Sequence, residues 1–224
     1  MKQIYEQGTL QMVRSQNNLV FVAKQDEHEG KTSIVYRMYD CGTGAVSPVT
    51  RSVFLLAKFG NIFEQFENDP NEFISCKAVV LPDFRTLIVL KNGSAVIYGK
   101  DGKIEWSGHA LYKDQAPSAL AVSGNTVWAA YKNPSAVIAY SAEHHLRRTL
   151  RIGGDGDLPT GLCGLYVCDD GALRVCAADE KKIIEVDTER FTFKNYMSFT
   201  DPVTDYEKIN SNEFVLTEKG IFRL

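Results

Sequence analysis

The sequence predicts an all-β fold, a five-bladed β-propeller of four-stranded antiparallel blades. The stretch 117–152 contains four short runs of apolar, β-branched and aromatic residues joined by turns, and each run has the length and composition of a strand. A sequence repeat supports this prediction, because Lys91-Asn-Gly-Ser-Ala-Val-Ile97 recurs as Lys132-Asn-Pro-Ser-Ala-Val-Ile138, 41 residues further along the chain. That spacing is typical of a four-stranded propeller blade, which takes about 40–45 residues.

The rest of the chain divides into similar units. Three strand-like runs near the C-terminus leave the last blade one strand short, whereas a spare run, Lys2 to Gln7, precedes the first blade. If this run pairs with Ile221–Leu224, it completes the fifth blade, closes the ring and covers both edges of the array. The sequence therefore predicts a single propeller domain over 1–224. The expected blades are 9–49, 75–110, 117–152, 160–199, and 203–224 together with 1–8.

The character of the strands supports this order. Inner strands such as Ala78–Leu81 and Ala119–Val122 are apolar on both faces, as expected for buried strands. Outer strands alternate instead, as in the fourth blade, where Phe191 and Phe193 alternate with polar residues. Half-exposed strands show this alternation.

The segment 50–73 interrupts the repeat and is too short to form another blade. It carries Phe59, Ile62, Phe63 and Phe66 at helical spacing, followed by a Pro-containing stop at 67–70. We expect a short amphipathic helix or a structured loop between the first two blades. Its aromatic stripe has two interpretations: a docking surface for a protein partner, or a packing surface against the channel or the neighbouring blades.

The fourth blade carries a recognisable repeat pattern. It has a proline before the inner strand in Leu158-Pro-Thr-Gly161, an Asp-Gly turn at 169–171, an apolar Val175, and a strand ending in aspartate, Lys182-Ile-Ile-Glu-Val-Asp187. In these features the chain resembles propeller repeat proteins of the NHL and YVTN type. It departs from NHL repeats in having no Asn after Ala178-Asp179, and it has no Trp-Asp pair of the WD type. The resemblance implies an architecture and leaves function open.

Composition limits the classes of partner. The 224 residues include 25 basic and 28 acidic side chains, for a net charge of −3. A nucleic-acid-binding protein usually carries a basic excess, so no nucleic-acid partner is predicted. The apolar run Val53–Ala57 is too short to span a bilayer, and the first eight residues show no signal-peptide pattern, so no membrane association is expected. Five cysteines, an odd number, favour reduced thiols and a cytoplasmic location.

Lysines recur in the connections between second and third strands, which all emerge on one face of a propeller. A ring of cations there would attract an acidic protein surface or a small anionic ligand. The alternative is that exposed turns simply favour lysine. The lysines at these positions are Lys24, Lys91, Lys132, Lys181 and Lys219, with Lys182 beside the fourth.

Carboxylates near predicted strand starts leave a catalytic alternative open. Asp157, Asp201, Asp205 and Glu207 lie where a propeller glycoside hydrolase would place its acid and base, but no pair stands out. Neither a cofactor nor a metal site is predicted. Three groups of residues carry possible metal ligands but do not amount to a site: Asp155 with Asp157, Cys163 with Cys168 and Cys176, and His144 with His145. The three cysteines are expected to be buried apolar thiols.

From these features we predict a non-catalytic binding scaffold that presents its lysine-bearing face, with the aromatic stripe, to a protein partner. The alternative is a propeller that binds a small molecule, either an anion or a carbohydrate, including the case of a glycoside hydrolase.

Overall fold

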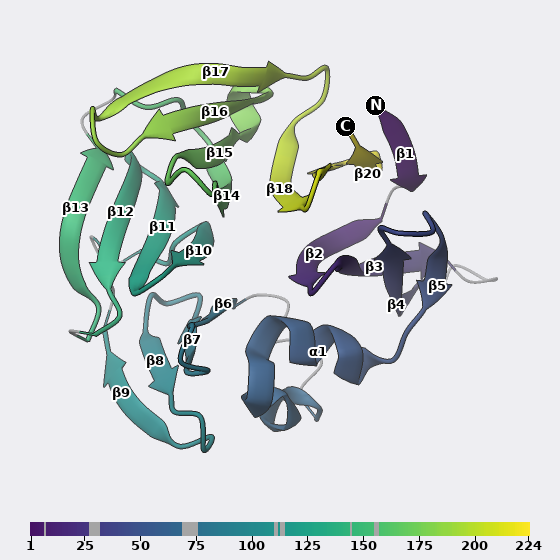
Figure 1. The fold of residues 1–224 in the computed structure, drawn as a ribbon, viewed down its shortest axis with the longest axis horizontal. Helices are drawn as coiled ribbons and strands as arrows, with labels where there is room; N and C mark the ends of the chain where they lie inside the picture. Colours follow the sequence, from purple (N-terminus) through teal and green to yellow (C-terminus); the bar gives the residue numbers. More distant parts are fainter. Residues whose placement is uncertain are drawn as a thin grey trace.

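The protein is described here by a computed structural model that covers residues 1–6, 8–26, 32–68, 76–109, 112, 115–143, 145–154 and 157–224. Five four-stranded antiparallel sheets surround a common axis (Figure 1). The predicted five-bladed propeller is therefore confirmed.

Each blade runs outward from an inner strand. Blade 1 consists of β2 (Thr9–Ser15), β3 (Asn18–Asp26), β4 (Thr32–Asp40) and β5 (Val46–Pro48). Blade 2 consists of β6 (Lys77–Val80), β7 (Thr86–Val89), β8 (Ala95–Tyr98) and β9 (Ile104–Gly108). Blade 3 consists of β10 (Ala119–Ser123), β11 (Thr126–Lys132), β12 (Ser135–Ser141) and β13 (Arg147–Gly153). Blade 4 consists of β14 (Leu162–Val167), β15 (Leu173–Ala177), β16 (Lys182–Asp187) and β17 (Thr192–Ser198).

Blade 5 joins the two ends of the chain. Its first three strands are β18 (Val203–Ile209), β19 (Asn212–Thr217) and β20 (Gly220–Arg223), and β1 (Lys2–Tyr5) is the fourth. β1 and β20 pair antiparallel as predicted, with Lys2 opposite Arg223, and the two termini lie close together (Figure 1). The last residue of the strand predicted there, Gln7, lies outside the described residues. The ring closure expected from strand counting is thus confirmed.

The hydrophobic core is divided among the spaces between neighbouring blades. Between blades 2 and 3 it includes Leu87 and Val127, and between blades 3 and 4 it includes Val137 and Val175, all fully buried. Second and third strands therefore have both faces covered. This explains their near-continuous apolar sequences, because a strand buried on both sides has no solvent-facing positions.

A helical insertion lies between blades 1 and 2, where it fills a wide space in the ring (Figure 1). It consists of α1 (Arg51–Phe59) and the 3-10 helix η2 (Gly60–Phe66), so the expected amphipathic helix is present. Phe59 is 0 % exposed, and its ring stacks on that of Phe66 at 4.1 Å between centroids.

Phe63 and Phe66 are partly buried against the same cluster, which contains residues of both blades. Of the two interpretations of the aromatic stripe, docking surface or packing surface, the structure shows packing. The stripe covers apolar surface that blades 1 and 2 would otherwise leave open, and binding by Phe59, Phe63 and Phe66 stays a prediction. None of the helices in the described ranges is long and apolar enough to cross a membrane.

Polar contacts also join blades, most clearly blades 4 and 5. The guanidinium of Arg174 on β15 lies 3.8 Å from the ring centroid of Tyr196 and 3.4 Å from Oε1 of Glu213 on β19. It also donates a hydrogen bond to the hydroxyl of Tyr206 on β18 and lies 3.8 Å from Glu185. The side chain of Arg174 is only 12 % exposed, so this charge depends on its partners for compensation.

Candidate functional site

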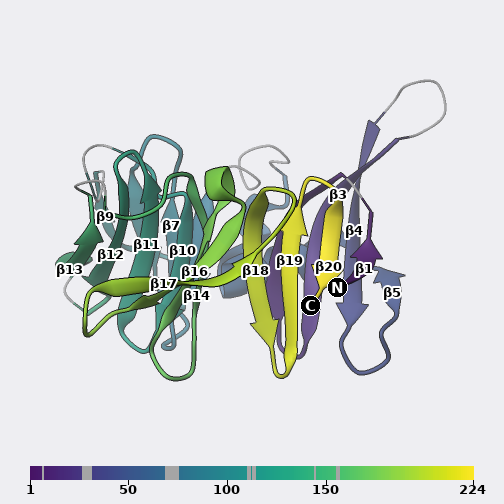
Figure 2. The ribbon, with the colours of Figure 1, turned by 90° about the horizontal axis from the view of Figure 1, so that it is seen from above.

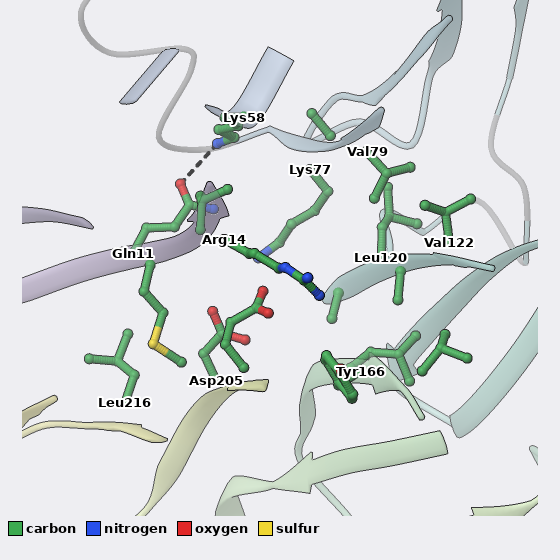
Figure 3. Close-up of a pocket in the computed structure, with 18 of the residues that line it drawn as sticks. Gln11, Arg14, Lys58, Lys77, Val79, Leu120, Val122, Tyr166, Asp205 and Leu216 are labelled. Carbon is green, nitrogen blue, oxygen red and sulfur yellow. Dashed lines mark hydrogen bonds between the residues drawn. The ribbon is translucent and has the colours of Figure 1, made fainter. Parts of the chain in front are cut away.

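A cavity of about 1040 Å³ lies on the axis of the ring and is lined by the inner strands of all five blades (Figure 3). Its lining extends from residues at the starts of these strands, such as Cys163, to residues at their ends, such as Ser123. Pockets for small molecules typically have volumes of roughly 300–1,000 Å³. The central channel is therefore large enough to hold a small-molecule ligand.

Three of the five inner strands carry a β-bulge at an equivalent position. In β2 the ladder shifts between Thr9 and Gln11, in β14 between Leu162 and Gly164, and in β18 between Val203 and Asp205. The inner strands β6 and β10 pair with their neighbours without a shift. Bulges change the direction of side chains and are frequent beside functional sites. The bulged blades 4, 5 and 1 are consecutive, so the channel has one irregular side and one regular side.

Charged side chains from the bulged side and from β6 meet in the channel. Figure 3 shows Arg14 of β2, Lys77 of β6 and Asp205 of β18 pointing into the same space. Glu207 lies two residues after Asp205 on the same strand and also lines the channel, as expected from the two-residue period of a strand. Among the described residues, none of these four takes part in an ion pair.

The opposite side of the channel is apolar. Val79 of β6 and Leu120 and Val122 of β10 line it, away from the charged groups (Figure 3). Each of these side chains is only partly buried and packs against the cluster between blades 2 and 3. The channel thus offers charged groups on one side and a hydrophobic surface on the other.

The two channel carboxyl groups have raised pKa values. Burial, together with the negative charge of Asp205, raises the pKa of Glu207 to about 8, and Arg14 opposes this shift. Burial also raises the pKa of Asp205 to about 6, against the effect of Lys77 and of a hydrogen bond from the backbone N–H of Tyr206 to Oδ1 at 3.0 Å. At neutral pH, Glu207 is therefore mostly protonated and can donate a hydrogen bond, whereas Asp205 is mostly ionised.

A buried lysine supports the channel wall from the helical insertion. Lys58 of α1 is 4 % exposed, and its Nζ donates hydrogen bonds to Oε1 of Gln11 at 2.9 Å and to the carbonyl oxygen of Cys76 at 3.1 Å (Figure 3). Burial lowers its pKa to about 8. Lys58 therefore ties the helix to β2 and to the start of β6, and it adds positive charge beside the channel at neutral pH.

The cysteines of blade 4 differ in exposure. Cys176 is fully buried, as expected, but Cys163 and Cys168 are partly exposed and line the channel. The thiol of Cys163 lies 3.3 Å from the carbonyl oxygen of Val203, to which it donates a hydrogen bond, and burial raises its pKa to about 11. A thiol in this state is protonated at neutral pH and is a poor nucleophile.

The lysines predicted to form a ring are distributed one to each of the five blades. All five are exposed. Four of them lie in or directly beside the connections between second and third strands, whereas Lys24 lies within β3, two residues before its end. Figure 2 shows one such connection, β19–β20, at the upper edge of the ring. Lys219 forms an ion pair with Asp201 at 2.8 Å, and Lys132 also lines the channel. Binding by these residues stays a prediction. The residues are Lys24, Lys91, Lys132, Lys181 and Lys219.

The predicted carboxylates are divided between two places. Asp205 and Glu207 come together in the channel, whereas Asp201 pairs with Lys219 and Asp157 is exposed on the surface. Asp155 and His144, which were considered for metal binding, lie outside the described residues. The cationic partners of these carboxylates, namely Arg14, Lys58 and Lys77, were not among the residues predicted from the sequence. The signal available for two of them was a charged residue at the end of an otherwise apolar inner strand.

Comparisons with known proteins bear on the fold alone. No protein-family model matches the chain, and no curated protein matches it in sequence. Solved structures do match. The WD40 β-propeller domain of Doa1 has a TM-score of 0.56 and 9 % identity over 95 % of this chain and 61 % of that one. A catalytically inactive virginiamycin B lyase from Staphylococcus aureus, determined with quinupristin, has a TM-score of 0.53 and 12 % identity over 97 % of this chain and 84 % of that one.

The chain is a β-propeller at the level of architecture. The WD40 repeats of RRP9 also match, with a TM-score of 0.52 and 12 % identity over 66 % of this chain and 49 % of that one. The chain thus spans less than two thirds of the length of either WD40 structure. Because no Trp-Asp pair occurs in the sequence, the likeness lies in the arrangement of blades and not in the repeat sequence. The predicted resemblance to propeller repeat proteins is confirmed in that sense.

Proposed function

We propose that the protein is a non-catalytic binding scaffold that presents its lysine-bearing face to an acidic protein partner. The observation that carries this proposal is the presence of one exposed lysine in or near the connection between second and third strands in each of the five blades. The cytoplasmic location expected from the cysteines is part of the proposal.

The electrostatics of this face support attraction of an acidic surface. Within the described chain, Lys24, Lys91, Lys132 and Lys181 form no ion pair, so their charges are not neutralised by direct neighbours. Lys219 is the exception because it pairs with Asp201. Several like charges around a channel mouth produce a field that raises the association rate of an oppositely charged partner and falls with salt.

The positions of the carboxyl groups support a non-catalytic role. A glycoside hydrolase places its acid and its base or nucleophile on the two sides of the scissile bond. Asp205 and Glu207 instead project from one strand, two residues apart, and so occupy the same side of the channel. Asp201, which could have supplied an opposing group, forms an ion pair with Lys219.

The test compares two charge-reversal variants that change the net charge equally. Lys91→Glu with Lys181→Glu alters the lysine-bearing face without touching the channel lining. Lys100→Glu with Lys103→Glu alters exposed lysines of the β8–β9 connection, which joins third and fourth strands and so belongs to the other face. A partner is captured from native-source lysate, and its affinity for each variant is then measured directly at low and moderate salt. We expect the first variant to weaken binding about tenfold or more and the second to have little effect. Equal affinities for both variants would overturn the proposal.

A further inference from the structure

The central channel combines features of a small-molecule site that do not depend on the proposed scaffold function. We propose that it binds the carboxylate of a small organic acid with an apolar tail. In this site, Arg14 and Lys77 hold the carboxylate, while Val79, Leu120 and Val122 contact the tail.

The geometry provides both halves of such a site. The cavity of about 1040 Å³ places the Arg14 and Lys77 side chains within one space, facing an apolar wall from β6 and β10 (Figure 3). Among the described residues, the hydrogen bond donated by Arg14 uses Nε, which contacts the carbonyl oxygen of Gln16 at 3.2 Å. The two Nη groups therefore remain for a bidentate contact with a carboxylate, a geometry that suits the guanidinium group.

The balance of charges selects the sign of the ligand. Arg14, Lys77 and Lys58 contribute positive charge at neutral pH, and Lys132 adds another near the strand starts. Glu207 is mostly protonated there, so Asp205 supplies most of the opposing charge close by. The groups that meet in one space, Arg14, Lys77 and Asp205, carry a local excess of one positive charge, which a single negative charge on the ligand compensates, whereas Lys58 is turned to Gln11 and Cys76. An amine would meet two cations, and a phosphate dianion would bring a second negative charge beside Asp205 without a matching cation.

The backbone gives independent support. The bulges lie in consecutive inner strands, β14, β18 and β2, of which β2 and β18 carry Arg14 and Asp205, while β6 and β10 are regular. A ring of equivalent blades needs no such difference for closure. The irregularity places Gln11 and Asp205 at the bulges themselves, which is where a ligand-binding channel would require side chains to be redirected.

The first experiment compares four probes that each contain a six-carbon chain by titration calorimetry at pH 7: hexanoate, hexanamide, hexyl phosphate and hexylamine. We expect hexanoate to bind most tightly, hexyl phosphate to bind more weakly, and the amide and amine to show no measurable heat. Tighter binding of hexylamine or hexyl phosphate than of hexanoate would overturn the proposed ligand class. No binding of hexanoate by the wild-type protein would overturn the site.

The second experiment assigns the residues. Arg14→Gln and Lys77→Gln should each weaken hexanoate binding about tenfold, since each removes a charge-assisted hydrogen bond. Lys91→Gln, which removes a lysine outside the channel lining, should leave it unchanged. Thermal unfolding of each variant establishes that it is folded, and Arg14→Lys, which keeps the charge, should recover part of the affinity. Unchanged affinity in folded Arg14→Gln and Lys77→Gln would contradict the assignment.

The third measurement follows the affinity from pH 7 to pH 9. Glu207 is faced by Asp205 from its own strand, by Arg14 from β2 and by Tyr166 from β14, while Lys77 of β6 faces Asp205. As Glu207 loses its proton and Lys58 its charge, hexanoate should bind progressively more weakly. Glu207→Gln should retain more affinity at pH 9 than the wild type does. A wild-type affinity that rises with pH would contradict the proposal.

Discussion

Replacing Glu207 by glutamine should change how the stability of the protein depends on pH. In the folded protein, burial raises the pKa of Glu207 from an ordinary value of 4.5 to about 8. The folded state therefore holds a proton that the unfolded state has already released. Its contribution to stability is fully present below pH 4.5 and is lost as the pH rises through 8. Glutamine keeps the shape of the side chain and removes this titration.

The size of the effect follows from the shift. A shift of one pKa unit corresponds to about 1.36 kcal/mol. Because the carboxyl of Glu207 is ionised in the unfolded state and has a pKa near 8 in the folded state, the free energy of unfolding falls by about 2 kcal/mol between pH 6 and pH 8. Glu207 keeps some contact with solvent in the channel, which reduces the penalty, so we expect about 1 kcal/mol. The interval starts at pH 6 because most of the contribution from Asp205, with its pKa raised to about 6, has been lost by that point.

The assay is urea unfolding at pH 6, 7 and 8. The free energy of unfolding of the wild type should fall relative to that of Glu207→Gln across this range. Glu189→Gln serves as the matched control, because Glu189 is an exposed carboxyl in the β16–β17 turn. Equal slopes for the wild type and Glu207→Gln would refute the argument that this group is protonated in the channel at neutral pH.

Three further predictions concern the packing of the blades, each measured by urea unfolding. Gly164→Ala should lower the free energy of unfolding by about 1–3 kcal/mol, because a Cβ there would lie 2.8 Å from Sγ of Cys176 and 2.9 Å from Cα of Asp205. The control is Gly42→Ala, whose Cβ would meet only a side-chain oxygen at 3.2 Å. An equal loss of stability in both variants would contradict the reasoning. Arg174→Gln should cost about 2–4 kcal/mol by leaving Glu213 and Glu185 without their buried partner, whereas Lys194→Gln, whose 74 % exposed side chain also pairs with Glu185, should cost less than about 1 kcal/mol. Deleting residues 1–6 should lower the unfolding midpoint and increase light scattering, because it uncovers the edge of β20; an unchanged midpoint would show that ring closure contributes little.

Much of the fold could be predicted because its determinants are local. Each strand is short, apolar or alternating, and bounded by turn residues, as in Thr126–Tyr131 between Gly124 and Pro134. The closure predicted for the run from Lys2 to Gln7, of which Lys2–Tyr5 forms β1, followed from counting strands, since a ring of sheets leaves no other place for a spare strand. The structure places the predicted strands within a few residues of their expected ends.

The channel could be predicted only in part because its content depends on which blades meet. Asp205 and Glu207 were recognised as candidates from their position near a strand start, but nothing local in the sequence pairs them with Arg14 or Lys77, which come from other blades. The bulges were also invisible, because a single extra residue in an apolar strand leaves the pattern of turns unchanged. The burial of Phe59 could not be predicted for a related reason: periodicity identifies an apolar face but not the surface that covers it.

The two proposed binding surfaces differ in how they relate to the repeat. The lysines repeat once in each blade, so their charge is distributed around the whole axis and favours no one side of the ring. The charged groups of the channel do not repeat in every blade, since they come from β2, β6 and β18, while β10 contributes an apolar wall. A small ligand with one charged end needs such an asymmetric site, whereas an extended acidic surface can engage a symmetric ring. The two surfaces therefore suit two different ligands, and loss of hexanoate binding in Arg14→Gln should leave the affinity for a protein partner unchanged.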